Sequence, residues 1–202
     1  MTFLEQVDIV FFRLFNQSLV HPFADDLMVF LTDARLSLHI ILLIVLFILL
    51  RRGWKETVFF LLVAAAAVGM SDYIASGLLK PFVQRIRPCF ALPDVRLLIV
   101  QPNSYSFASS HAANSTATAV VIWIFFHSAL SQAEKIFRFV VLVYALLISW
   151  SRIYVGVHYP GDVVAGIIIG IVCAMLVYLL LSWTFKNVVQ NRYLAASSSQ
   201  RP

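Results

Sequence analysis

Long apolar stretches separated by short polar segments run through most of the chain. Four of them are long and apolar enough to form membrane-spanning helices: residues 58–79, 112–130, 136–150 and 163–185. A helix rises about 1.5 Å per residue, so roughly 20 apolar residues cross the hydrocarbon of a bilayer. A fifth apolar stretch, residues 36–50, is shorter. The pattern predicts a membrane protein built from α-helices.

The N-terminal segment is less regular than these stretches. Over residues 1–20, apolar positions follow helical spacing with charged residues between them, which is typical of an amphipathic helix in the membrane interface. Residues 23–31 would extend the fifth stretch backward, but Asp33 and Arg35 interrupt the pattern. We therefore predict one all-α domain over residues 1–202: a polytopic membrane bundle of five to six spans with an N-terminal interfacial helix.

Composition excludes a disordered chain and a water-soluble domain. Hydrophobic residues make up 61% of the 202 positions and charged residues 12%, against roughly 45–50% and about 25% in soluble domains. Cys89 and Cys173 provide neither a metal cluster nor a disulfide framework. The N-terminus has no basic segment followed by a cleavage site, so we do not expect a removed signal peptide.

The side of the membrane follows from the basic residues in the connecting loops. One set of loops carries Arg51, Arg52, Lys55, Lys135, Arg138, Lys186, Arg192 and Arg201 against Glu56 and Glu134. The positive-inside rule makes this side cytoplasmic and places the N-terminal 35 residues outside. The loop of residues 80–111 is then also outside, yet it is basic, with Lys80, Arg85, Arg87 and Arg96 against Asp94. A basic outer loop needs an explanation other than topology.

Reactive side chains form three clusters at the outer ends of the expected spans. They are Lys80 with Arg87 and Pro88, then Ser109 with Ser110 and His111, then Ser151 with Arg152, His158 and Asp162. Lysine and arginine bind phosphate, and a helix that begins after Ser109 points free N–H groups at the same anion. Imidazoles titrate near neutral pH and suit nucleophile and acid roles. Asp162 is expected to cap the last span with its carboxylate turned toward His158.

These residues resemble the three-part signature of the type 2 phosphatidic acid phosphatase superfamily, membrane lipid phosphatases related to vanadium-dependent haloperoxidases. The family pattern is K-x6-R-P, then P-S-G-H, then S-R-x5-H-x3-D. The first and third parts match in full, and the second matches at Ser109 and His111. Ala108 and Ser110 replace its proline and glycine. The resemblance covers roughly residues 58–185.

The resemblance implies a lipid phosphatase that works through a phosphohistidine. His158 would attack phosphorus, Asp162 would orient His158, and His111 would protonate the departing oxygen. The phosphate oxygens would be held by Lys80, Arg87, Arg152, Ser109 and Ser110. No metal or other cofactor would be required, because the cations supply the positive charge. The serine at position 110, where the family has glycine, leaves open how closely the backbone approaches the phosphate.

Short loops leave no soluble domain to select a water-soluble substrate, so the expected partner is a phosphorylated membrane lipid and not a nucleic acid. Undecaprenyl diphosphate, phosphatidylglycerol phosphate, phosphatidic acid and the phosphates of lipid A all fit. A lipid phosphotransferase and a non-catalytic lipid-phosphate binding or transport protein remain as alternatives. The expected location is the inner cell membrane, with the site on the extracytoplasmic face. The oligomeric state stays open.

The remaining polar residues receive structural interpretations. Arg85 and Arg96 are taken as topological anchors or lipid-headgroup contacts, and His21, His39 and His127 as satisfied polar residues. Asp72 lies inside a span and must face the bundle interior. It would form a structural hydrogen bond there or support the phosphate site from two turns before Lys80. Residues 194–202 are expected to be a disordered terminus.

Overall fold

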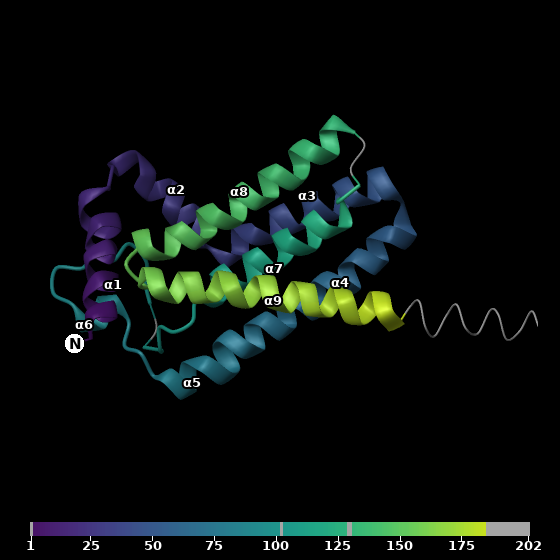
Figure 1. Cartoon of the computed structure of the whole chain (residues 1–202). Coiled ribbons are helices and arrows are strands. Elements are labelled where there is room, and N and C mark those ends of the chain that lie inside the picture. Colours follow the sequence, from purple (N-terminus) through teal and green to yellow (C-terminus); the bar gives the residue numbers. More distant parts are fainter. Residues whose placement is uncertain (1, 102, 129–130, 185–202) are drawn as a thin grey trace, which may run out of the picture.

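The computed structural model describes residues 2–101, 103–128 and 131–184, with the backbone alone for residues 34–37. Within these ranges the secondary structure is helical (Figure 1). In chain order the elements are α1 (Phe3–Arg13), the π-helix η1 (Leu14–Ser18), α2 (Pro22–Thr32), α3 (Ala34–Arg52), α4 (Trp54–Asp72), the π-helix η2 (Tyr73–Leu79), α5 (Lys80–Val83), α6 (Pro88–Ala91), α7 (Ser110–Phe125), α8 (Gln132–Tyr154) and α9 (Pro160–Thr184). The expected all-α class is confirmed.

Three helical segments of the described residues are long and apolar enough to cross a membrane: Trp54–Ala91, Gln132–Tyr154 and Pro160–Thr184. Helix α7 lies in the middle of the bundle and packs against α4, α8 and α9, while α3 packs against α4. An apolar core lies among these helices and includes Ile48, Phe60, Ile122 and Phe126. The bundle therefore encloses α7, whose first residues belong to the second sequence motif.

Helices α7 and α9 approach each other closely because α9 carries glycines on the shared face. A Cβ atom at Gly166 would lie 2.4 Å from the carbonyl oxygen of Ser109, and one at Gly170 would lie 2.4 Å from that of Ala113. Small residues let helix backbones come together in a membrane. At the end of this contact the Ser109 N–H donates to the Asp162 carbonyl oxygen at 3.0 Å. The glycines thus hold the second and third motifs side by side.

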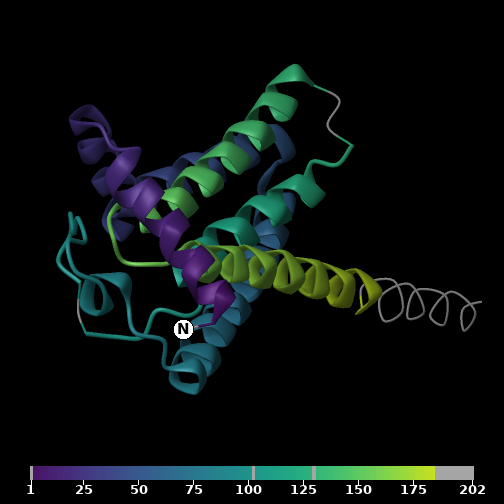
Figure 2. The same cartoon turned by 60° about the vertical axis from the view of Figure 1, so that its left-hand side comes forward.

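The N-terminal helix α1 lies across one end of the bundle, next to the start of α9, in both views (Figures 1 and 2). A capping box between Thr2 and Glu5 starts the helix. Phe12 is buried and meets the Tyr159 ring at a centroid distance of 5.6 Å. Apolar side chains on the other face are exposed: Phe3, Leu4, Val10 and Phe11. This face fits the amphipathic helix that the sequence predicts.

The structure corrects several predicted boundaries. Asp33 has extended backbone geometry between α2 and α3, so residues 23–31 do not lengthen the following helix. They form α2, which packs against α8. The expected span 58–79 lies in helix that continues through Val83, and Lys80 is therefore on a helix and not in the loop. Residues 129–130, 185 and 194–202 lie outside the described residues.

Candidate active site

The three sequence motifs meet at the end of the bundle that α1 covers. This end contains the last turn of the α4–α5 helix, the start of α7, the end of α8 and the start of α9 (Figure 1). Lys80 reaches Ser110, and Arg87 reaches His158. His111 interacts electrostatically with Arg152 and His158 as well as with Lys80 and Arg87. All eight residues that the sequence singled out are therefore gathered at one site.

His158 is almost fully buried, with 2% of its surface exposed. A guanidinium nitrogen of Arg87 lies 3.0 Å from its Nε2 atom, and a carboxylate oxygen of Asp162 lies 3.5 Å from its Nδ1 atom. Arginine can only donate hydrogen bonds, so Nε2 accepts and the ring proton sits on Nδ1. Burial lowers the pKa of His158 from 6.5 to about 3, although Asp162 opposes this change. At pH 7 the ring is therefore neutral, with the lone pair on Nε2.

The Asp162 carboxylate is buried and fully engaged. Its Oδ2 atom accepts the backbone N–H of Tyr159 at 2.9 Å and the hydroxyl of Ser106. Its Oδ1 atom accepts a hydrogen bond from Arg85 at 2.7 Å. Helix α9 begins at Pro160, so Asp162 sits in the first turn, and the expected capping position is wrong by this shift. The expected direction of the side chain, back toward His158, agrees with the structure.

Three cations beside the histidines have only neutral partners. Lys80 donates to the Ser110 hydroxyl at 2.8 Å, and Arg87 donates to the carbonyl oxygens of Ser104 and Val157 at 3.0 and 2.9 Å. Arg152 donates to the Thr32 hydroxyl, and its buried Nε has no hydrogen-bond partner. Among the described residues, none of the three cations forms a salt bridge. A buried charge without a counterion is costly, so this arrangement favours an anionic ligand.

The start of α7 adds further donors. Ser109 is the N-cap, and its hydroxyl accepts the backbone N–H of Ala112 at 3.5 Å. The first N–H groups of a helix lack intrahelical partners and attract anions. Ser110 is the first residue of the helix and His111 the second. The Ser109 side chain therefore caps the helix, and the Ser110 hydroxyl at the start of the first turn contacts Lys80.

Sequence reasoning missed several residues of this site. Arg85, taken as an anchor, bridges Asp162 and Asp8 with N–O distances of 2.7 and 2.6 Å. Asp8 gave no signal, because it lies on the N-terminal helix far from the motifs. Ser106 and Thr32 also gave none. Only the unexplained basic character of the outer loop could have pointed to Arg85.

The structural interpretation of Asp72 agrees with its contacts, whereas that of Arg96 as an anchor or headgroup contact does not. The Asp72 carboxylate accepts a hydrogen bond from the Asn114 amide at 3.1 Å, inside the bundle. Arg96 pairs with Asp25, which also accepts the Tyr154 hydroxyl at 2.7 Å. In the described ranges, no group of three or more His, Cys, Asp or Glu side chains is placed to hold a metal ion.

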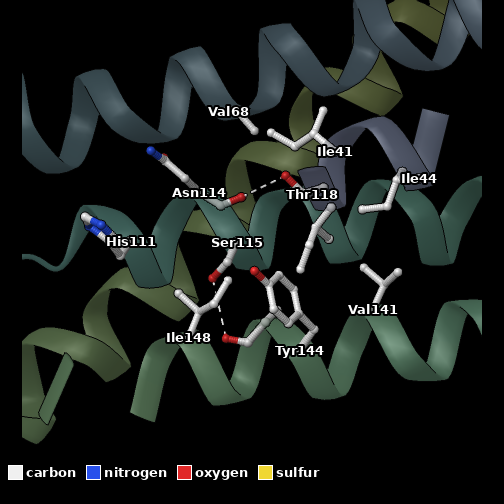
Figure 3. Close-up of a pocket in the computed structure, with 12 residues that line it drawn as sticks. Ile41, Ile44, Val68, His111, Asn114, Ser115, Thr118, Val141, Tyr144 and Ile148 are labelled. Atoms are coloured by element: carbon white, nitrogen blue, oxygen red, sulfur yellow. Dashed lines mark hydrogen bonds between the residues drawn. The ribbon is translucent and has the colours of Figure 1, made fainter. Parts of the chain in front are cut away.

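An elongated cavity of about 330 Å³ leads away from the site between α3, α7 and α8. Figure 3 shows His111 at one end and the apolar side chains of Ile44 and Val141 toward the other. The polar side chains that α7 places on its wall after His111, those of Asn114, Ser115 and Thr118, form hydrogen bonds within the protein. Thr118 donates to the Asn114 carbonyl oxygen at 3.0 Å, and Ser115 to that of Ala145 at 3.5 Å (Figure 3). The cavity wall is therefore chiefly hydrocarbon.

A helical bundle with a cationic, histidine-containing site at one end of its apolar helices defines a class of membrane protein that handles an anion. The model of the PAP2 superfamily matches residues 60–186. The chain belongs to this superfamily, as the three motifs indicated.

Relatives with assigned names match parts of the chain. Lipid A 4'-phosphatase of Bacteroides thetaiotaomicron is 32% identical over 108 residues, 51% of this chain and 45% of that protein. Phosphatidylglycerophosphatase B of Bacillus subtilis is 33% identical over 110 residues, 53% of this chain and 51% of that protein. The chain thus spans about half the length of the curated relatives it matches.

A solved structure shows the same fold over a larger part of the chain. It is described as the first transmembrane PAP2 type phosphatidylglycerolphosphate phosphatase from Bacillus subtilis. The two structures superpose with a TM-score of 0.68 at 24% identity, covering 90% of this chain and 88% of the other. The membrane fold is therefore common to both proteins.

Proposed function

We propose that this protein is a membrane lipid phosphatase that hydrolyses a phosphomonoester or pyrophosphate through a phosphohistidine. One observation carries the proposal: a neutral, buried His158 lies between Asp162 and Arg87, beside two further cations without carboxylate partners. A bound phosphate would supply the missing negative charge. It would also draw the Arg87 guanidinium away from Nε2 and so expose the lone pair.

The proposed reaction has two steps. First, His158 Nε2 attacks phosphorus, a P–N bond forms, and the bond to the lipid oxygen breaks while His111, which the negative charge of the bound phosphate keeps protonated, gives that oxygen a proton. Second, water attacks the phosphohistidine, His111 takes a proton from it, and the P–N bond breaks to release phosphate. Lys80, Arg87 and Arg152 stabilise the negative charge in both transition states. Asp162 holds the Nδ1 proton throughout, which keeps Nε2 aimed at phosphorus.

The cavity beside His111 supports a lipid substrate. Its apolar lining comes from side chains of α3, α4 and α8, while α7 contributes polar side chains and the residue assigned as the acid. A headgroup phosphate at the cations would place the following hydrocarbon chain at its mouth. The names of the relatives, a lipid A phosphatase and a phosphatidylglycerophosphatase, fit the same substrate class.

The proposed topology has five spans, formed by α3, the α4–α5 helix, α7, α8 and α9. Arg51 and Arg52 lie at the end opposite the site, which makes that end cytoplasmic by the positive-inside rule. The site then faces outward from the inner membrane, with α1 in the outer interface.

Asn103 and Tyr105 are exposed beside the site. Cysteines placed there, with Cys89 and Cys173 replaced by serine, should react in intact cells with an impermeant thiol reagent. Reaction only after permeabilisation would reverse the assignment.

The direct test is phosphate release by purified protein from undecaprenyl diphosphate, phosphatidylglycerol phosphate, phosphatidic acid and lipid A. We expect release from at least one lipid, continued activity in EDTA, and inhibition by vanadate. An acid-labile phosphoprotein should be trapped from labelled substrate in wild type and be absent in His158→Ala. Product formation that depends on a second lipid acceptor would instead identify a phosphotransferase. Tight lipid binding without any turnover would identify a binding or transport protein.

A further inference from the structure

A chain of ionic contacts connects the N-terminal helix with the carboxylate that faces His158. One Arg85 nitrogen donates to Asp162 Oδ1 at 2.7 Å, and another donates to Asp8 Oδ2 at 2.6 Å. Asp8 lies on α1, whereas Asp162 lies in the first turn of α9. Arg85 is thus the common partner of two carboxylates from opposite ends of the sequence. Hydrogen bonds of this kind between charged groups are the stronger class in proteins.

Asp8 also binds α9 directly. Its Oδ1 atom accepts the backbone N–H of Gly161, the residue before Asp162, at 2.7 Å. A Cβ atom at position 161 would lie only 2.9 Å from Asp8 Oδ2. Glycine at this position therefore provides the space that Asp8 occupies. One carboxylate on α1 holds both the backbone before Asp162 and the arginine that binds its side chain.

Aromatic contacts keep this arrangement in place. The Arg85 guanidinium lies 4.0 Å from the centre of the Tyr159 ring. The other contact of this ring is Phe12 of α1. Cation–π contacts of this kind are stronger when the partners are removed from water. Tyr159 also gives its backbone N–H to Asp162 Oδ2. The same small group of residues therefore holds α1, Arg85 and Asp162.

We propose that Asp8 and Arg85 are positioning residues, which fix the Asp162 carboxylate against His158 Nδ1 and so couple the N-terminal helix to the nucleophile. The proposal rests on the proposed phosphatase function for its kinetic consequence. Asp162 Oδ2 faces His158 while Arg85 holds Oδ1 from the other side. Without Arg85 the carboxylate keeps the Tyr159 and Ser106 contacts but loses its outer restraint. A misplacement on the order of 1 Å at such a group costs about 10²-fold in rate.

The kinetic test compares variants that break different contacts of this group. We expect Arg85→Met to lower kcat by roughly 10²-fold and Asp8→Asn by roughly 10-fold, each with KM within about threefold of wild type. Arg85→Lys and Asp8→Glu should restore part of the loss. Gly161→Ala removes no charge and favours the helix, yet it should match Asp8→Asn because the methyl group displaces Asp8. The double variant Asp8→Asn with Gly161→Ala should lose no more than either single variant.

Glu5→Gln is the matched control. Glu5 is on the same helix, lines the same surface depression as Asp8, and makes its contacts with Thr2. Glutamine preserves the capping box, so the change removes one negative charge beside Asp8 and leaves α1 intact. Its kcat should equal that of wild type. Equal losses in Glu5→Gln and Asp8→Asn would overturn the proposal in favour of a general charge effect, as would unchanged kcat in Arg85→Met.

A second measurement needs no substrate. In protein labelled with ¹⁵N-histidine, the His158 ring signals, assigned by their loss in His158→Gln, should show the proton on Nδ1. Arg85→Met and Asp8→Asn should shift these signals, and Glu5→Gln should not. Identical His158 signals in all variants would overturn the positioning role, whatever the substrate is. Vanadate binding tests the phosphate site separately, because Lys80, Arg87 and Arg152 are intact in every variant. Wild type that neither binds vanadate nor hydrolyses lipid would refute the proposed function alone.

Discussion

Both ends of the bundle carry paired arginines, but in the described part of the chain only the site end also has buried arginines without a carboxylate partner. At the end away from the site, Arg52 forms a salt bridge with Glu134 at 3.1 Å and lies 4.9 Å from the centre of the Phe126 ring. Arg51 donates to the Ser131 hydroxyl at 2.8 Å and is exposed to solvent. At the site end, Arg87 and Arg152 are buried, and the described groups to which they donate hydrogen bonds are neutral.

This difference separates charges that orient a membrane protein from charges that bind a ligand. An exposed or paired arginine costs little, and it remains in the cytoplasmic headgroup region as the positive-inside rule describes. A buried arginine without a carboxylate destabilises the empty protein and is compensated only by an incoming anion. Under the proposed function, the buried cations of the site end bind a negatively charged group, and the basic residues of the opposite end orient the protein in the membrane.

The largest expected effect comes from His158, compared with His127 at the opposite end of the bundle. His158→Ala should abolish turnover, a loss of at least roughly 10⁴-fold, because the nucleophile has no substitute. His127 lies just beyond α7 at the other end, beside the Ile124 carbonyl oxygen. His127→Ala should keep wild-type activity. Phosphate-release assays of both variants measure this difference. Near-normal hydrolysis by His158→Ala would refute the mechanism.

The next largest effect comes from comparing Arg152 with Arg52. Removing Arg152 should lower activity but not stability, and removing Arg52 should lower stability but not activity. Arg152→Met should lower kcat by roughly 10²–10³-fold, as loss of a transition-state donor does. It should also keep or raise the melting temperature, because it removes a buried charge without a counterion.

Arg52→Met should do the opposite. It breaks a pair with Glu134, so the melting temperature should fall, while activity remains within about twofold of wild type. Thermal unfolding in detergent, run beside the kinetic assay, measures both quantities. Loss of stability in Arg152→Met comparable with that in Arg52→Met would contradict the assignment of Arg152 to an anion site.

The buried state of His158 predicts a dependence of stability on pH. With its pKa lowered to about 3 in the folded protein, His158 takes up a proton in the unfolded chain first, below about pH 6.5. Its contribution to stability is complete above pH 6.5 and is lost as pH falls toward 3, by up to about 1.4 kcal/mol per pH unit. The free energy of unfolding of His158→Gln should therefore fall less steeply between pH 6 and 4. Parallel curves for the two proteins would show that His158 is charged when folded.

The smallest expected effect concerns the serine that replaces the glycine of the family pattern. Ser110→Gly keeps the backbone N–H at the start of α7 and removes the hydroxyl that accepts from Lys80. We expect a rate loss of roughly 2- to 13-fold, which corresponds to about 0.5–1.5 kcal/mol. Ser109→Ala should cost at least as much, because Ser109 caps the helix. A loss in Ser110→Gly as large as that in Arg152→Met would give the serine a chemical role.

Much of the fold could be predicted because apolar length and charge placement are local properties. The long apolar stretches became α3, α4, α7, α8 and α9, with ends displaced by a few residues. The break at Asp33 was harder to place, since a charged residue can either end a helix or face a bundle interior. Packing of α2 against α8 decided this case.

The sequence predicted most of the residues that form the candidate site, but it did not predict the contacts between them. The motifs supplied Lys80, His111, His158 and Asp162 because each lies at a fixed spacing within its segment. Arg85 was misread because its two carboxylate partners lie 77 residues away in opposite directions along the chain. No local pattern encodes a partner at that separation.

The sequence by itself determined that this chain is a helical membrane protein of the PAP2 superfamily, and it predicted which side chains form the candidate site. Hydrophobicity and motif spacing are properties of residues close together in the sequence, so they can be recognised without knowing the fold. The tertiary structure alone decided which cations lack counterions, which histidine nitrogen carries the proton, and that Asp8 reaches Asp162 through Arg85. These properties depend on distances between segments remote in the chain, and only the packing of α1, α7 and α9 brings those segments together.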